Sequence, residues 1–159
     1  PLDLGRVVAI GHSAGGHFAL WLASRTAIPR DSELHEAVPL PLAGAVSLDG
    51  PADLAAMIPL QQVICRTPVI TDLFGGSPEA RPERYRSASP IEMLAAGQSF
   101  EFFAGPMFAA QVGPFTERAR AHGAGLRVTT LAEAGHFGFI DPESTVWPQV
   151  LQAVRRLLE

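Results

Sequence analysis

A short glycine-rich stretch near the start of the chain has the residue types needed to turn a serine into a nucleophile. Residues 11–15 read Gly-His-Ser-Ala-Gly and fit the pattern G-x-S-x-G. In this pattern, called the nucleophile elbow, the serine stands on a sharp, strained turn between a strand and a helix. We expect glycine at positions 11 and 15 because side chains there would collide with the neighbouring strand and helix. A serine held in this way can attack a carbonyl carbon and form an acyl-enzyme.

The backbone of the residue after the serine could stabilise the negative charge that such an attack creates. The backbone N–H of Ala14 can donate to an oxyanion, and the N-terminus of the following helix favours negative charge. The alternative is a glycine-rich strand-to-helix turn that carries a non-catalytic serine. The apolar strand pattern before Ser13 and the helical pattern after it favour the nucleophile.

A histidine late in the chain is the candidate general base. His136 lies in the segment Glu-Ala-Gly-His-Phe, directly after a predicted strand, where it could take the proton of Ser13. Taken alone, His136 would be interpreted as a surface-loop histidine, but the elbow upstream favours catalysis. We expect His12 to pack or to line the pocket, and His17 to be a buried histidine with its hydrogen bonds satisfied. Phe137 and Phe139 flank the loop and either line a substrate pocket or pack beneath it.

The elements that must hold these residues alternate between strand and helix. Apolar runs predict strands over residues 6–11, 43–48, 99–104 and 126–131. Helical patterns are found in residues 14–25, 54–58 (behind Asp53 as N-cap), 69–74, 114–122 and 147–158. The fold class is therefore α/β, with a mostly parallel sheet of about four strands and helices on both faces.

Composition limits the other classes of function. The chain has 159 residues, of which 47% are hydrophobic and 18% charged, as in one globular domain or part of a larger one. A net charge of −4 argues against a nucleic-acid partner. The single Cys65 excludes a disulfide framework, no zinc-binding motif is found, and we expect no metal and no cofactor. No apolar run reaches the roughly 20 residues that span a bilayer. The expected partner is a small-molecule ester or amide; the oligomeric state is left open, and the lack of a signal peptide favours the cytoplasm.

These motifs resemble the α/β-hydrolase superfamily, and within it bacterial serine esterases of the arylformamidase-like kind. The resemblance is carried by residues 11–17 (GHSAGGH), 75–78 (GGSP), 85–90 (YRSASP) and 134–137 (AGHF), with Asp141-Pro142. It implies that Ser13 is the nucleophile, His136 the base and Ala14 one oxyanion donor. It also implies hydrolysis of carboxylic esters, or of an aryl formamide, through an acyl-serine intermediate.

The resemblance covers nearly the whole chain but only the C-terminal half of that family's domain. The strand of residues 6–11 would be the fifth of eight. The family's upstream His-Gly-Gly loop, which gives the second oxyanion donor, has no match here. Because the chain starts at Pro1 and runs directly into a strand, we expect residues 1–159 to be one domain that forms the C-terminal part of a longer catalytic domain. A rival expectation is an unstable fragment whose first strand exposes an unpaired edge.

The acid that would complete a catalytic triad with Ser13 and His136 is hard to identify in this sequence. The family order is serine, acid, histidine, and the acid normally follows the strand of residues 99–104. Phe108 stands at that position, and no Asp occurs between Asp72 and Asp141. Three explanations remain open: Asp49 is the acid, as in some lipases; the site is degenerate and the chain is a non-catalytic binding module; or residues 98–115 reflect a reading-frame error. For Asp49 the alternative role is that of a turn residue before Gly50-Pro51.

Overall fold

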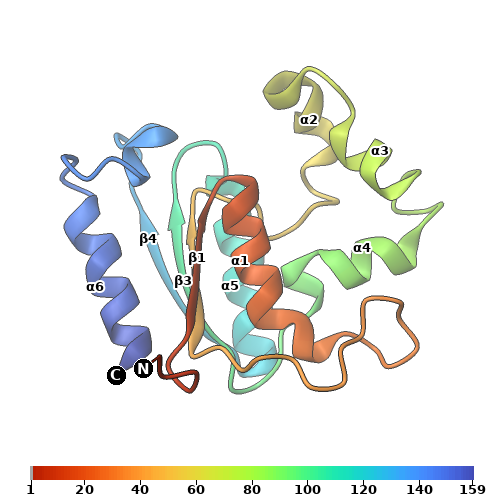
Figure 1. Ribbon diagram of the computed structural model, residues 1–159. Coiled ribbons are helices and arrows are strands. Elements are labelled where there is room, and N and C mark those ends of the chain that lie inside the picture. Colours follow the sequence, from red (N-terminus) through yellow and green to blue (C-terminus); the bar gives the residue numbers. More distant parts are fainter. Residues whose placement is uncertain (1) are drawn as a thin grey trace.

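The sheet has four parallel strands whose order along the chain is also their order in space. A computed structural model describes residues 2–159 and contains β1 (Val8–His12), β2 (Gly44–Leu48), β3 (Ser99–Ala104) and β4 (Gly125–Thr130). They pair in the order β1-β2-β3-β4 (Figure 1). The predicted parallel sheet is confirmed. Since all four strands run the same way, their carboxyl ends meet at one edge of the sheet.

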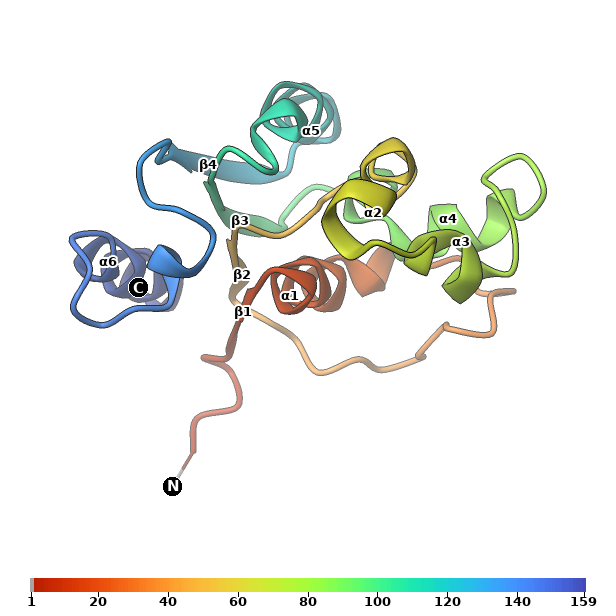
Figure 2. The same cartoon turned by 90° about the horizontal axis from the view of Figure 1, so that it is seen from above.

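Helices cover both faces of the sheet, as predicted. Seen from above, α1 (Ala14–Ser24) and α5 (Ala109–His122) lie on one face and α6 (Trp147–Leu158) lies on the other (Figure 2). The bounds of α6 agree with the prediction because its apolar stripe is strongly periodic; Val150 and Ala153 on that stripe are buried.

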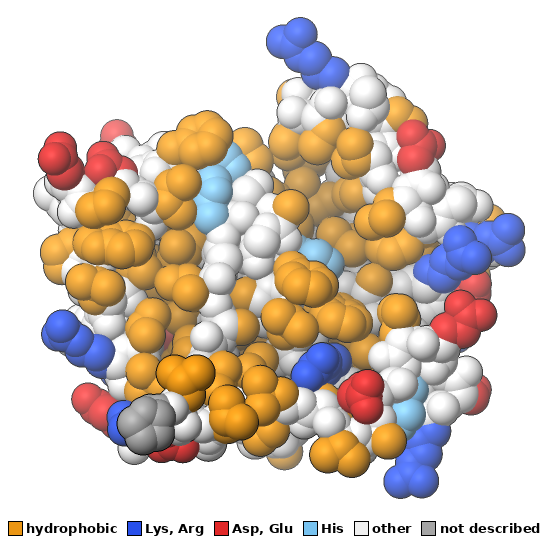
Figure 3. Space-filling view, in the orientation of Figure 1, with side chains coloured by type: hydrophobic (Ala, Val, Ile, Leu, Met, Phe, Trp, Pro, Cys, Tyr) orange, Lys and Arg blue, Asp and Glu red, His pale blue; other side chains and the backbone are white. Residues whose placement is uncertain are grey.

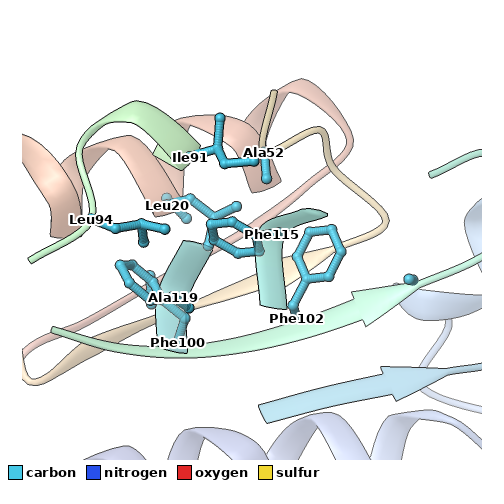
Figure 4. Close-up of a cluster of buried hydrophobic side chains, with 11 residues drawn as sticks. Leu20, Ala52, Ile91, Leu94, Phe100, Phe102, Phe115 and Ala119 are labelled. Atoms are coloured by element: carbon cyan, nitrogen blue, oxygen red, sulfur yellow. The ribbon is translucent and has the colours of Figure 1, made fainter. Parts of the chain in front are cut away.

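Strand β3 supplies both sides of the core. Phe100 and Phe102 point toward α1 and α5, where they pack with Leu20 and Phe115 (Figure 4). Phe103 points to the opposite face and packs in the cluster that α6 covers. This alternation follows from the two-residue period of a strand, and it explains why a strand buried on both faces is apolar almost throughout.

The segment between β2 and β3 contains more helices than predicted. It contains α2 (Ile58–Cys65), α3 (Val69–Phe74) and α4 (Pro82–Ala88), and it lies beyond α1 on the same side of the sheet (Figure 2). Of these three helices, only α3 was predicted. Both α2 and α4 begin with a proline in their first turn, a position where proline is compatible with a helix.

The short helix expected over residues 54–58 is wrong. Asp53 does accept a hydrogen bond from the backbone N–H of Ala56 through Oδ1, at 3.0 Å, but the turns that follow do not continue as a helix, and α2 starts at Ile58. Asp53 therefore forms the side-chain contact expected of an N-cap, but no helix follows it directly.

Other boundaries shift modestly. Helix α5 begins at Ala109 rather than at Pro114, which lies inside the helix and removes one intrahelical hydrogen bond there. Short 3-10 turns cover Arg25–Ala27, Pro90–Glu92 and Phe137–Phe139. In residues 2–159 no helix has both the length and the apolar character that crossing a membrane requires.

Candidate active site

Ser13 occupies the strained turn that the elbow pattern predicts. It links β1 to α1 with φ 56° and ψ −122°, a conformation that residues with a side chain rarely adopt. The Ser13 N–H donates to the Leu48 carbonyl at 2.9 Å, and the Ser13 carbonyl accepts from the N–H of His17 at 3.1 Å. Bonds to β2 on one side and to the first turn of α1 on the other hold the strained backbone in place.

The steric need for glycine at the elbow is only partly as expected. A Cβ on Gly11 would overlap the carbonyl of Gly15, as predicted. The prediction for Gly15 is wrong, because a Cβ there would meet no atom within 4 Å. Glycine is required instead at Gly16, where a Cβ would lie 2.7 Å from the Ser47 hydroxyl, and at Gly50, where it would lie 2.5 Å from the carbonyl of the elbow serine. The first turn of α1 presents Gly16, not Gly15, to β2 and its loop.

Among the acidic residues considered, Asp49 is the one that the structure brings to His136. His136 Nδ1 lies 2.7 Å from Asp49 Oδ2, and the Asp49 side chain is only 1% exposed. Asp49 directly follows β2 with φ 46°, and its N–H donates to the Phe103 carbonyl at 2.8 Å. Because an ionised carboxylate can only accept hydrogen bonds, this contact puts the proton on Nδ1. In the neutral imidazole with its proton on Nδ1, Nε2 is the nitrogen that can accept a proton.

The loop after β3 contributes a backbone donor to this arrangement. The N–H of Gly105 donates to Asp49 Oδ1 at 2.8 Å, so the two carboxylate oxygens have one partner each. Phe108, which stands where the resemblance expects an acid, is buried, and its ring centroid lies 6.3 Å from that of His136. An aromatic ring therefore packs near the imidazole from this loop.

His12 packs against the loop that carries His136. Its Nε2–H donates to the His136 carbonyl at 2.8 Å, and the two ring centroids are 4.4 Å apart. The packing role expected for His12 is found, with the candidate base itself as the main contact. Among the described residues no hydrogen bond joins Ser13 Oγ to His136. Bonds of this kind often tighten only when substrate is bound.

The remaining predicted residues have distinct surroundings. Ala14 opens α1, where the first N–H groups have no intrahelical acceptor. Phe137 is 69% exposed beside His136, with ring centroids 5.2 Å apart, whereas Phe139 is fully buried and belongs to the core under α6. His17 is half-buried, and its Nδ1–H donates to the Pro51 carbonyl at 3.3 Å. Burial lowers the pKa of His17, and the hydrogen bond to Pro51 opposes this in part.

One buried side chain that the sequence analysis did not identify holds the loop that follows Asp49. Gln111, in the first turn of α5, accepts hydrogen bonds from the N–H groups of Ala52 and Asp53 at 2.7 and 2.9 Å. It also donates to the Asp53 carbonyl at 3.1 Å. The only signal in the sequence was a polar residue interrupting an apolar stretch, and this does not identify the partner.

Two hollows are found elsewhere than at Ser13 and His136. One, of about 930 Å³, is bounded by residues 29–34 and by α3 and α4; the other, of about 80 Å³, lies between α2 and the start of α5. Neither is lined by Ser13 or His136. Within residues 2–159 no three or more His, Cys, Asp or Glu side chains are grouped so that they could hold a metal ion.

Comparison with known families identifies the family of the chain. The BD-FAE family model matches residues 1–103, which is well over half of the chain. The chain belongs to the BD-FAE family. This family consists of α/β-hydrolase-like esterases. The BD-FAE match includes Ser13 and Asp49 and ends before His136.

Solved structures of similar fold are esterases. A truncated carbohydrate esterase from gut microbiota superposes with a TM-score of 0.70 at 17% identity, over 93% of this BD-FAE chain and 58% of that one. Esterase 2 of Thermogutta terrifontis gives a TM-score of 0.64 at 20% identity with butyrate bound, and 0.66 at 19% identity when phosphonylated by sarin. Both comparisons cover 95% of this chain and 55% of that esterase. No curated protein sequence matches the chain.

These likenesses define how much of the fold is present. The chain spans 55–58% of the length of the three structures. The parallel sheet of β1 to β4 with its flanking helices is thus a partial α/β-hydrolase fold. The predicted resemblance to the α/β-hydrolase superfamily is confirmed.

Proposed function

We propose that this BD-FAE chain is part of a serine hydrolase that cleaves carboxylic esters through an acyl-Ser13 intermediate. The observation that carries the proposal is the 2.7 Å contact between His136 Nδ1 and the buried carboxylate of Asp49. Acyl-transfer enzymes on several unrelated folds use a serine together with a histidine that is oriented by a buried acid. Here Ser13 follows β1 and His136 lies in the segment after β4, so both follow carboxyl ends of strands in the same parallel sheet. Residues 1–159 would form a single, partial catalytic domain.

The proposed reaction uses the chain's own groups in a fixed order. Ser13 Oγ attacks the carbonyl carbon of the ester while His136 Nε2 takes its proton. Asp49 stabilises the resulting imidazolium, and the N–H of Ala14 donates to the oxyanion. The ester C–O bond then breaks, and the alcohol leaves with the proton from His136. Water, activated by the same imidazole, then attacks acyl-Ser13. The carboxylic acid product is released, and the Ser13 hydroxyl is restored.

A carboxylic ester is the proposed substrate class. Esterases of similar fold have been solved with butyrate bound and phosphonylated by sarin, which supports this choice. An aryl formamide would follow the same steps through a formyl-serine. The alternative, a non-catalytic binding module, rested on the missing acid after β3; the contact between Asp49 and His136 supports the hydrolase instead.

The first test of the proposal is covalent labelling. We expect a fluorophosphonate to modify the folded protein at Ser13, located by mass spectrometry, because the elbow and imidazole activate this hydroxyl. The Ser13→Ala variant is the control and should not be labelled. A chain that is folded by circular dichroism and remains unlabelled would contradict the proposed nucleophile.

The second test concerns the acid. Asp49→Asn should lower kcat for a p-nitrophenyl ester by about 10⁴-fold, because the amide no longer fixes the Nδ1–H tautomer. Asp53→Asn is a matched control in the same loop. The Asp53 side-chain oxygen accepts a hydrogen bond from the backbone N–H of Ala56, and an amide oxygen can do the same. Equal activity of the two variants would exclude Asp49 as the acid.

A further inference from the structure

Among residues 2–159 the Asp49 carboxylate has two hydrogen-bond partners, and one of them is a backbone group in the loop after β3. Oδ2 contacts His136 Nδ1 at 2.7 Å, and Oδ1 accepts from the N–H of Gly105 at 2.8 Å. The side chain of Asp49 is almost fully buried. A carboxylate removed from water in this way depends on both contacts for its orientation.

Because Gly105 has no side chain, the Asp49 carboxylate can lie close against its backbone. A Cβ on Gly105 would lie 3.0 Å from both Asp49 oxygens and 3.1 Å from its Cγ. The φ angle of Gly105 is not among the positive values found in this chain, so alanine could adopt this backbone without strain. The three atoms nearest to an added methyl group would all belong to the Asp49 carboxylate.

Neither side of this contact can easily move away. Gly105 follows directly on β3, where the Ala104 carbonyl accepts from Leu131 at 3.0 Å, and its own carbonyl accepts from Phe108 at 3.3 Å. On the other side, the Asp49 N–H is bonded to Phe103, and Gly50 is packed tightly against the elbow. An added methyl group would therefore be accommodated by turning the carboxylate, and turning it lengthens the bond to His136.

We propose that Gly105 is the positioning residue for the candidate acid: its N–H holds one oxygen of Asp49, and its missing side chain lets the other oxygen reach His136. This inference rests on the proposed function, because it assigns how an acid after β2 can serve in place of one after β3. In this arrangement the loop after β3 does not carry the acid itself. It supplies the Gly105 N–H as a donor to Asp49, and the absent side chain of Gly105 makes room for the carboxylate.

The test compares Gly105→Ala with Gly113→Ala. Gly113 is exposed in α5, where an added Cβ would meet nothing within 4 Å, so this control should fold and keep its activity. Gly105→Ala should lower kcat by about 10–10²-fold, the cost of a small misplacement of a catalytic group. KM should change less than about twofold, because Gly105 is not expected to touch the substrate.

A double variant separates positioning from general damage. If Gly105 acts through Asp49, then adding Gly105→Ala to Asp49→Asn should lower kcat no further. Losses that multiply would overturn the inference, since they would mean that Gly105 acts independently of Asp49. Activity of Gly105→Ala equal to that of Gly113→Ala would also overturn it and leave the proposed function intact. An unaltered kcat in Asp49→Asn alone would instead contradict the proposed function.

A spectroscopic measurement tests the positioning without any turnover. The Nδ1 proton of His136, bonded to a carboxylate, should give a downfield proton resonance that disappears in Asp49→Asn. We expect this resonance to shift or disappear in Gly105→Ala and to stay unchanged in Gly113→Ala. An unchanged resonance in Gly105→Ala would overturn the inference even if the chain had no esterase activity.

Discussion

At the scale of single residues, the nucleophile and the acid candidate share an unusual backbone. Ser13 has φ 56° and Asp49 has φ 46°, and each directly follows a strand. Such conformations cost of order 1–3 kcal/mol each and persist only where surrounding bonds hold them. Here each residue's N–H continues the sheet ladder, from Ser13 to Leu48 and from Asp49 to Phe103. The sheet therefore holds both strained residues at neighbouring strand ends.

His17 gives a prediction about stability at this scale. Burial lowers the pKa of His17 in the folded protein below its usual value of about 6.5. The unfolded chain therefore takes up the proton first as the pH falls. The free energy of unfolding should decrease below about pH 6.5, by up to ~1.4 kcal/mol per pH unit from this one residue. Urea unfolding between pH 7.5 and 5.5 measures this dependence.

A pair of histidine variants isolates the effect. His17→Gln should flatten the decrease in the free energy of unfolding toward low pH. His122→Gln, at an exposed position at the end of α5, should keep the wild-type slope. The same slope in His17→Gln as in wild type would show that the acid sensitivity arises elsewhere.

At the scale of elements, an ion pair ties α6 to the middle of the sheet. The Arg156 guanidinium bonds both oxygens of the Glu101 carboxylate, at 2.8 and 2.9 Å. Glu101 lies on β3 and is buried on the face that α6 covers, with Arg127 a more distant partner at 3.6 Å. The hydrogen bond to Glu101 raises the pKa of Arg156. This pair fixes how α6 docks, together with the apolar stripe of the helix.

Removing the cation should leave a buried, poorly compensated carboxylate. We expect Arg156→Ala to lower the free energy of unfolding by about 3 kcal/mol, at the low end for a broken buried pair because Arg127 remains nearby. Arg155→Ala, at the exposed neighbouring position, should change it by less than about 0.5 kcal/mol. Chemical denaturation of the two variants measures the difference. Equal stabilities would mean that the pair contributes nothing to the docking of α6.

At the scale of the whole molecule, β1 forms an open edge of the sheet. Within residues 2–159 it pairs with β2 alone, and Figure 3 shows hydrophobic side chains gathered on the face that carries β1 and α1. Exposed apolar residues in these elements and in the segments that precede β1 and β2 are Leu2, Leu4, Ile10, Phe18, Val38 and Leu40. An unpaired strand beside apolar surface is a template for pairing with another chain.

We therefore expect the 159-residue chain alone to self-associate as its concentration rises. Ile10→Lys should reduce this association, because a charge on an edge strand opposes pairing; Ile10 is 47% exposed. Val63→Lys, at an exposed apolar position on α2, is the control and should have no effect. Sedimentation velocity would measure both. A monomer at every concentration, or a response to Val63→Lys alone, would contradict the role of β1.

Local sequence patterns were sufficient for much of the fold and for two of the site residues. The strands, α1, α3 and α6 follow from apolar periodicity, and the strained turn at Ser13 follows from a strand, a glycine pattern and a helix in succession. His136 was selected because it follows a strand end. These features depend on neighbours within a few residues, where sequence and conformation are closely coupled.

Tertiary structure alone decided which groups meet. From the sequence, Asp49 was one explanation among three; its contact with His136 depends on parallel β2, β3 and β4 ending at a common edge in the order that the sheet adopts. The same register brings Gly105 to the carboxylate and Gln111 to the loop behind it. These residues are distant along the chain, and no local pattern encodes their separation in space. The sequence by itself therefore determined the candidate nucleophile and base, while the packing of the sheet determined which carboxylate contacts the candidate base and which groups hold that carboxylate.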